Sequence, residues 1–316
     1  MQLFAQQLVN GLTLGSVYAL VALGYTMVYG VLRLINFAHG ELFMLGAYLT
    51  LSATTVLGLG SASALGGAPA AGGGNVWQGA VLFLVIVAIG VAVAVAAVGL
   101  ALERIAYRPL RHSTRLAPVV SALGASVFLQ NAVMLIYGPR YQVLPEGLLP
   151  AWSAPVFGIE ITLLQFVILG ISVALMVGLY LFVQRTALGM AIRATALDHE
   201  AARLMGIKVD RVIQWVFVLG PALGAVAGLL IGLYYRQINF TMGWTYGLRA
   251  FTAAILGGIG NIPGAMVGGL LLGLLEAMGS GYISVAWKDA ITFFVLILIL
   301  IVRPTGLLGE RVAEKL

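Results

Sequence analysis

The sequence contains no cysteine and few charged residues. Without cysteine, the chain can form no disulfide, thiol nucleophile or thiolate metal site. Charged residues make up 9% of its 316 residues, whereas soluble domains carry about 25%. Hydrophobic residues account for 61%, and the mean hydropathy is +1.04. Because these residues form continuous runs instead of alternating with polar ones, we expect an all-α integral membrane protein rather than a membrane barrel.

Motifs for nucleotide binding and metal binding are also missing. A phosphate-binding loop requires a Gly-Lys step, but Lys208, Lys288 and Lys315 all follow other residues. The 3 histidines lie far apart and form no paired metal motif. We therefore expect a chain that is not an enzyme and holds no cofactor, so ATP could drive it only through another chain. The net charge of +6 does not point to nucleic acid, because the basic residues lie in loops beside spans, where they set orientation.

Long apolar runs are what the sequence does contain, and about 20 such residues cross a membrane. The runs cover about 5–31, 35–58, 79–103, 116–138, 160–184, 212–235, 247–278 and 284–303. We expect a polytopic helical bundle that forms one transmembrane domain over residues 1–316. The Gly/Ala/Ser/Pro-rich segment 58–78 carries no charge and is typical of a flexible outer linker. The first run is long enough to cross the membrane, and no basic residues precede it. We therefore do not expect a cleaved signal peptide.

Basic loops set the predicted orientation. The loop after the third run carries Arg104, Arg108, Arg111 and Arg115, and such loops lie in the cytoplasm. Counting back through three crossings places the N-terminus outside. If all eight runs crossed the membrane, the basic tail that begins at Arg303 would lie outside. That would conflict with the tendency of basic segments to lie in the cytoplasm. The conflict disappears if the run 247–278 enters and leaves on the same side.

The run 247–278 is also too long for a single span. As one helix its 32 residues would measure about 48 Å, against a hydrocarbon core of about 30 Å. Glycines and Pro263 interrupt it, which predicts two half-helices, with a kinked single span as the alternative. The break could expose backbone to a solute, or serve close helix packing. We assign Gly257, Gly258, Gly260 and Asn261 to a substrate pathway. Arg249 and Glu276 are interpreted as marking the ends of the run, with an ion pair as the alternative.

Asn36, His39 and Glu41 form the densest polar cluster beside a span. Such groups are costly in lipid and often line a pathway, so we assign all three to contact with a small polar solute. They could equally cap the helix that begins here, with Glu41 near the positive end of its dipole. The surrounding segment 35–40 shares four of six residues with 238–243, which indicates a possible inverted repeat.

The stretch 185–211 is the most polar part of the chain, with eight of its 28 charges. Thr195 is predicted to cap a short helix that ends at Gly206 in the left-handed conformation. Its apolar face is predicted to contain Leu197, Ala201, Leu204 and Met205. A short helix of this kind fits a groove on a soluble partner. The alternative is a surface helix that only connects two spans.

Several motifs together resemble one family. They are Asn10–Leu20, Gly24–Gly30, Ile35–Glu41, Glu103–Arg111, Phe251–Ala265 and Pro304–Gly306. These segments are similar to the permease subunits of branched-chain amino acid ABC transporters. The likeness runs nearly from end to end, and it is greatest to the first of the two permeases in high-affinity leucine/isoleucine/valine import systems.

The resemblance implies a bacterial inner-membrane subunit that imports leucine, isoleucine and valine. It implies a sister permease, two cytoplasmic ATPases that hold ATP and Mg²⁺, and a periplasmic binding protein. The family's coupling segment matches Arg193-Ala194, Ala201-Ala202 and Gly206-Ile207. We accordingly assign ATPase coupling to Arg193, Ala194, Leu197, Glu200, Ala201, Leu204, Gly206 and Ile207. The alternatives are a permease for urea or other amino acids, an ion-coupled secondary carrier and a passive channel.

Overall fold

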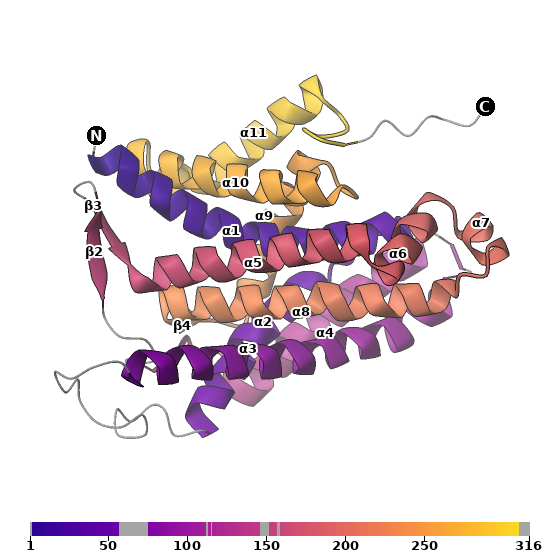
Figure 1. Ribbon diagram of the computed structural model, residues 1–316, viewed down its shortest axis with the longest axis horizontal. Helices are drawn as coiled ribbons and strands as arrows, with labels where there is room; N and C mark the ends of the chain where they lie inside the picture. The colour runs from indigo at the N-terminus through magenta and orange to yellow at the C-terminus, as the bar shows by residue number, and fades with distance from the viewer. Residues whose placement is uncertain are drawn as a thin grey trace.

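The computed structural model describes residues 2–56, 75–111, 113–114, 116–145, 152–156 and 159–309. Its helices run side by side along the longest axis of the molecule (Figure 1). Most of the predicted outer linker, residues 58–74, lies outside the described residues. Residues 75–78 of that segment belong to a helix, so the third span begins earlier than predicted.

Eleven α-helices make up the described part of the chain. They are α1 (Gln2–Leu32), α2 (His39–Val56), α3 (Asn75–Leu102), α4 (Leu116–Tyr137), α5 (Leu163–Arg185), α6 (Ala187–Leu197), α7 (His199–Leu204), α8 (Val209–Tyr235), α9 (Met242–Gly257), α10 (Ile262–Tyr282) and α11 (Lys288–Val302). A π-helical turn η1 (Glu103–Tyr107) and 3₁₀ turns η2 (Arg108–Leu110) and η3 (Val285–Trp287) complete the helical structure. Antiparallel pairs join β1 (Gln142–Val143) with β4 (Gln237–Ile238), and β2 (Ser153–Val156) with β3 (Ile159–Thr162).

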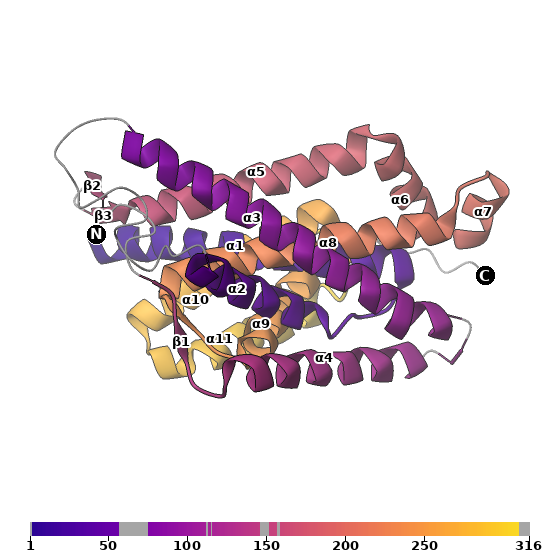
Figure 2. The ribbon, with the colours of Figure 1, turned by 90° about the horizontal axis from the view of Figure 1, so that it is seen from below.

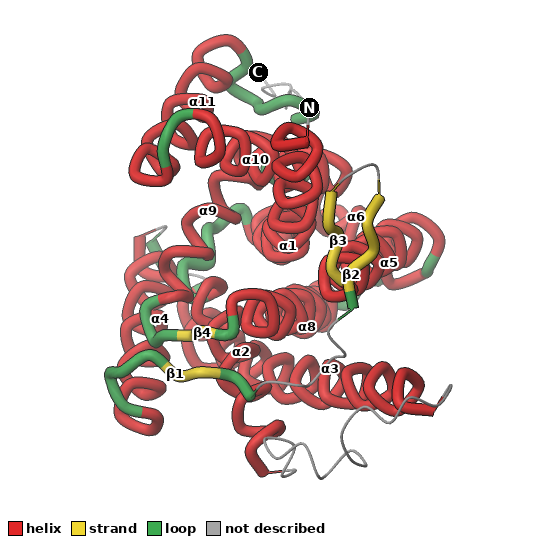
Figure 3. The backbone as a smooth tube through the Cα atoms, turned by 90° about the vertical axis from the view of Figure 1, so that its left-hand side faces the viewer, coloured by secondary structure: helices red, strands yellow, loops and turns green. Residues whose placement is uncertain are grey.

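The centre of the bundle is formed by α1 and α8, as the view along the helices shows (Figure 3). In their most apolar stretches, 94% and 83% of residues are buried, against 6% in α11. Within the described residues, seven helices are long and apolar enough to cross a membrane. A helix that is apolar on all sides belongs either in a core or in lipid. The chain is therefore a polytopic helical membrane protein, as predicted.

Small residues let α1 and α10 pack with their backbones close together. A Cβ on Gly273 would collide with the backbone of Gly15, and one on Gly269 with that of Ala19. Such contacts drive helix association in membranes. Lipid tails are as apolar as the side chains, so the hydrophobic effect does not favour contact between helices, and close packing does. The run 247–278 therefore does take part in close helix packing, the alternative role considered for it above.

The two ends of the bundle carry different elements. The N-terminus and the β2–β3 hairpin lie at one end, whereas α7 lies at the other (Figure 1). The basic turn between α3 and α4 lies at the α7 end as well (Figure 2). The basic loop after the third run and the polar stretch 185–211 thus lie at the same end of the bundle, as expected for cytoplasmic loops. We call the α7 end the inner end and the opposite one the outer end.

The predicted run 247–278 is two helices, α9 and α10, and the kinked single span is wrong. The break between them reaches the inner part of α1, where Gly260 lies 3.8 Å from the position of a Cβ on Gly30. From there α10 returns to the outer end, where Gly281 packs against Gln7. The helix α11 then runs back from the outer end (Figure 1), and the segment after it bonds to the break through Leu307 and Leu308, which resolves the orientation conflict.

The repeated segments 33–40 and 236–243 share two backbone features. Each opens on an arginine in the left-handed region, Arg33 with φ 54° and Arg236 with φ 57°. These two are the non-glycine residues with positive φ among the described residues. Six residues on, the amide of His39 donates to the carbonyl of Asn36 at 3.1 Å, and that of Met242 donates to Asn239 at 3.2 Å.

The two segments also meet each other. A Cβ added to Gly40 would collide with the carbonyl of Gly243, and one added to Gly243 would come within 2.9 Å of the carbonyl of Gly40. Contact between equivalent residues is what a pseudo-two-fold axis between the two segments would produce. One segment follows α1 at the inner end and the other follows α8 at the outer end, so the geometry supports an inverted repeat.

Candidate functional site

The stretch 185–211 contains two helices, α6 and α7, and protrudes at the inner end (Figure 1). We call residues 187–208 the coupling hairpin. The predicted cap at Thr195 is wrong, because α6 already begins after Thr186, whose hydroxyl accepts from the amide of Gly189 at 3.0 Å. Thr195 is buried inside α6 and donates to the carbonyl of Ala191 at 2.8 Å.

The cap of α7 is Asp198, in extended backbone conformation. Its carboxylate accepts from the amides of Glu200 at 2.8 Å and Ala201 at 3.1 Å. These amides have no partner within the helix, and a carboxylate there also faces the positive end of the helix dipole. The aspartate therefore separates α6 from α7 and orients the tip.

The predicted end of the helix at Gly206 is confirmed, since its φ is +83°. Its amide donates to the carbonyl of Arg203 at 2.9 Å, and the amide of Ile207 donates to that of Ala202 at 3.0 Å. This pair of bonds is the Schellman motif, which closes helices at a left-handed residue. The tip of the hairpin is thus closed by backbone bonds at both ends of α7.

Apolar side chains project from the tip into the surroundings. Leu197 is 83% exposed, Leu204 88% and Met205 82%, whereas Ala202 points inward and is buried. Glu200 and Ala201 are exposed beside them, and Ala194 and Ile207 are half-buried. Arg193 donates to the Gln184 side chain at 2.8 Å and so faces α5. Exposed apolar side chains on a charged element mark an interaction surface.

The second predicted site, around Asn36, His39 and Glu41, lies inside the bundle at the start of α2. Asn36 Oδ1 accepts from the amide of Ala38 at 3.0 Å and from the Tyr107 hydroxyl at 2.7 Å. The alternative in which Asn36 orders the start of this helix is therefore supported.

His39 and Glu41 are both buried, with 0% and 1% of their surface exposed. The His39 ring lies edge-on to Tyr25, with 4.7 Å between centroids. Glu41 Oε1 accepts from the Ser126 hydroxyl at 3.2 Å, while Oε2 has no hydrogen-bond partner among the described residues. A buried carboxylate oxygen without a partner is costly and is retained where it contacts something else. Gly243 lies against this oxygen, where a side chain would collide with it.

A hollow opens on the other side of Gly243. Its lining is mainly aromatic and aliphatic, and its cavity volume is about 20 Å³, room for about one water molecule. The lining residues are Tyr25, Phe37, Gly243, Trp244, Gly247, Leu248 and Phe251. The hollow and the carboxylate of Glu41 thus share Gly243 as their common wall.

The break between α9 and α10 is covered by the C-terminal segment. The carbonyls of Leu256 and Gly257 accept from the amides of Leu307 and Leu308, both at 2.9 Å. Asn261 caps α10 and its amide group donates to the carbonyl of Leu308 at 2.8 Å. Gly258 packs against the same segment, and Gly260 remains exposed. These contacts give the break a role in helix packing, and its role in a substrate pathway stays a prediction.

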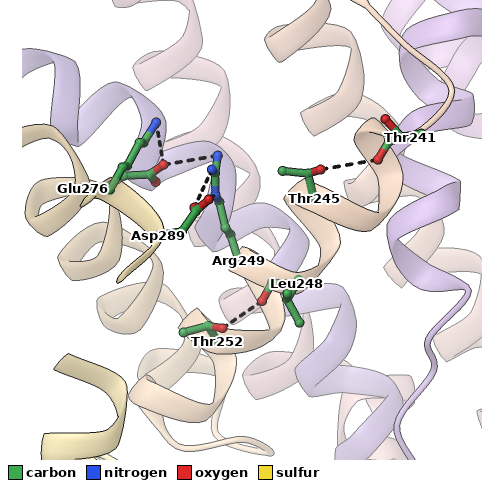
Figure 4. Close-up of polar contacts among 8 residues, drawn as sticks. Thr241, Thr245, Leu248, Arg249, Thr252, Glu276 and Asp289 are labelled. Carbon is green, nitrogen blue, oxygen red and sulfur yellow. Dashed lines mark hydrogen bonds and ion pairs between the residues drawn. The ribbon is translucent and has the colours of Figure 1, made fainter. Parts of the chain in front are cut away.

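Arg249 and Glu276 pair directly, so their interpretation as markers of helix ends is wrong. Arg249 Nη1 lies 3.2 Å from Glu276 Oε1, and its Nη2 lies 2.7 Å from Asp289 (Figure 4). Lys288 Nζ is 2.5 Å from the same oxygen of Glu276. The residues come from α9, α10 and α11, so their proximity depends on a tertiary arrangement that sequence spacing does not reveal. Their formal charges cancel, and the cluster fastens α11 to the bundle.

Known proteins resemble this chain along nearly its whole length. Residues 7–300 match the family described as branched-chain amino acid transport system / permease component. The high-affinity branched-chain amino acid transport system permease protein LivH of Salmonella typhimurium is 45% identical over 318 residues, covering 99% of this chain and 97% of LivH. BraD, a permease protein with the same description from Pseudomonas aeruginosa, is 45% identical over 317 residues, covering 99% and 98%. The chain therefore belongs to the family of permease components of branched-chain amino acid transport systems.

Proposed function

We propose that the chain is the pore-forming permease subunit of an ATP-driven importer of leucine, isoleucine and valine. The observation that carries this proposal is the exposed apolar tip of the coupling hairpin, at Leu197, Leu204 and Met205, on a chain that belongs to this permease family. A soluble ATPase would cover that tip in its groove. The complex would comprise a sister permease, two cytoplasmic ATPases with ATP and Mg²⁺, and a periplasmic binding protein, in the bacterial inner membrane.

The hollow beside Glu41 would widen during transport and then take one end of such a solute. A branched-chain amino acid carries an ammonium group, a carboxylate and an apolar side chain. The carboxylate of Glu41 would attract the ammonium group, and the aromatic wall at Tyr25, Phe37 and Phe251 would take the apolar side chain. His39 would support this wall from behind, because it is buried and its ring lies against Tyr25. Asn36 would hold the start of α2 in place through its bonds with Ala38 and Tyr107.

Transport would follow from movement of the hairpin. ATP-driven closure of the two ATPases displaces residues 194–206, and the shift tilts the spans from an outward-open to an inward-open arrangement. Rigid-body tilting suits this bundle, because its central helices pack through glycine contacts that leave few side chains to rearrange.

Uptake into vesicles that carry all subunits tests the proposal. Leucine should accumulate only when ATP is present, and an uncoupler should have no effect at constant ATP. Accumulation without ATP, or its abolition by the uncoupler, would support an ion-coupled carrier instead. Equilibration of leucine without ATP and without accumulation would support a channel. Competition of leucine and urea for the binding protein separates the two substrate classes, and binding of urea alone would contradict the proposed substrate.

A further inference from the structure

Two side chains fasten the joint between α6 and α7 to the inner end of α1. His199, the first residue of α7, donates from Nε2 to the carbonyl of Val31 at 2.7 Å. Arg33, the first residue after α1, donates from Nη2 to the carbonyl of Ala196 at 3.0 Å. The bonds run in opposite directions between the same two places in the fold.

Each bond closes the end of the opposite helix. The last four carbonyls of a helix have no partner within that helix. Val31 belongs to the last turn of α1, and Ala196 belongs to the last turn of α6. The Arg33 guanidinium also faces the negative end of the α6 dipole, which a cation stabilises. These two bonds therefore fasten the coupling hairpin to the end of α1.

The end of α1 leads directly into the inner copy of the repeat. Arg33 holds the left-handed conformation at φ 54°, which turns the chain sharply into the segment 33–40. That segment ends at Gly40, in backbone contact with Gly243 of the other copy. Eight residues thus connect the hairpin to Glu41 and the neighbouring hollow.

We propose that Arg33 and His199 pass the displacement of the coupling hairpin to the segment 33–40, which then moves the wall of the hollow. This inference rests on the proposed function, since it requires an ATPase that displaces the hairpin. Both are positioning residues, because they contact backbone carbonyls rather than the solute. Breaking their bonds should leave the ATPases bound and active while the permease no longer follows them.

The inverted repeat supplies a matched control. Arg236 holds the same left-handed conformation, at φ 57°, in the outer copy of the segment. It lies beside β4 at the opposite end of the bundle from the hairpin. The variants Arg33→Asn and Arg236→Asn therefore make the same chemical change at equivalent backbone positions. Asparagine tolerates the left-handed conformation, and its short side chain does not span the distance that the Arg33 guanidinium covers.

The experiment measures leucine accumulated per ATP hydrolysed, in vesicles that carry the full complex, for Arg33→Asn, His199→Ala, His199→Gln and Arg236→Asn. The first two should lower this ratio about tenfold, since Arg33→Asn removes a charge-assisted hydrogen bond and His199→Ala removes a half-buried one. The glutamine variant restores an N–H donor near the position of Nε2 and should recover the ratio. The Arg236→Asn variant should behave as wild type. The amount of ATPase that co-purifies should stay constant, because the apolar tip is unchanged.

An unchanged ratio in both Arg33→Asn and His199→Ala would overturn the inference while leaving the proposed function intact. Loss of the ATPases from these variants would also overturn it, because the bonds would then serve docking rather than transmission. An equal effect of Arg236→Asn would show that the left-handed turn matters rather than the contact with the hairpin. Leucine accumulation by the wild type without ATP would instead overturn the proposed function itself.

Discussion

Leu204 is the apolar side chain most exposed on the coupling hairpin, at 88%. The substitution Leu204→Asp should leave the protein inserted in the membrane but weaken ATPase binding at least about tenfold, since a charge would enter an apolar groove. Co-purification of the ATPases measures the effect directly. The control Leu204→Met keeps an apolar side chain of similar size and should bind normally. Full ATPase binding and stimulated hydrolysis by the aspartate variant would count against docking at this tip.

Glu41 is a buried carboxylate with one oxygen free of hydrogen-bond partners among the described residues. The isosteric change Glu41→Gln should lower leucine uptake about tenfold, because the ammonium group of the solute loses an ionic partner. Thermal stability should stay close to wild type, since the amide can still bond with Ser126. The exposed Glu160 offers a matched control in Glu160→Gln. Wild-type uptake by the Glu41 variant would remove this residue from the pathway.

Residue roles that depend on chain neighbours could be predicted from sequence. The left-handed Gly206 is an example, because glycine after an amphipathic run is a local signal. Thr195 was assigned wrongly as a cap, because an equally good signal at Thr186 starts a helix that continues through it. The pair Arg249–Glu276 and the bond of His199 to Val31 join distant segments. No spacing rule predicts such contacts.

Among the elements, α7 is short enough to depend on its cap. The change Asp198→Ala removes two bonds to the first amides of this six-residue helix. It should cost about 1 kcal/mol locally. Hydrogen exchange across residues 199–204 should become faster, and ATPase binding should weaken. Serine caps nearly as well, so Asp198→Ser should restore protection. Equal exchange in the alanine variant and wild type would show that packing alone orders the tip.

The elements that cross the membrane were predictable because each needs a long apolar run. The pair α9 and α10 was also predictable, since length and the break at residues 257–264 both exclude one helix. The start of α2 was not, because the apolar run begins at Ile35 while the helix begins at His39. Hydropathy does not register the turn at Asn36, which is fixed by side-chain bonds.

The whole molecule depends on the contact between the two copies of the repeat. The change Gly40→Ala places a methyl group against the carbonyl of Gly243, a backbone atom that cannot rotate away. Overpacking of this kind costs about 1–3 kcal/mol, so the melting temperature should fall. The control Gly178→Ala adds the same methyl group in α5, where nothing lies within 4 Å. Equal stability of the two variants would contradict a tight crossing of the repeats.

Cross-linking from the coupling hairpin tests the central claim most directly. Because the chain has 0 cysteines, Leu204→Cys introduces a single thiol for a bifunctional reagent. The control is Leu3→Cys. Leu3 belongs to α1 at the outer end and is 51% exposed, so a thiol there is also accessible to the reagent. In the assembled complex, the thiol at position 204 should cross-link to an ATPase and the thiol at position 3 should not. A thiol at position 204 that reacts only with a reagent added outside, or that links to no ATPase, would contradict the proposed importer.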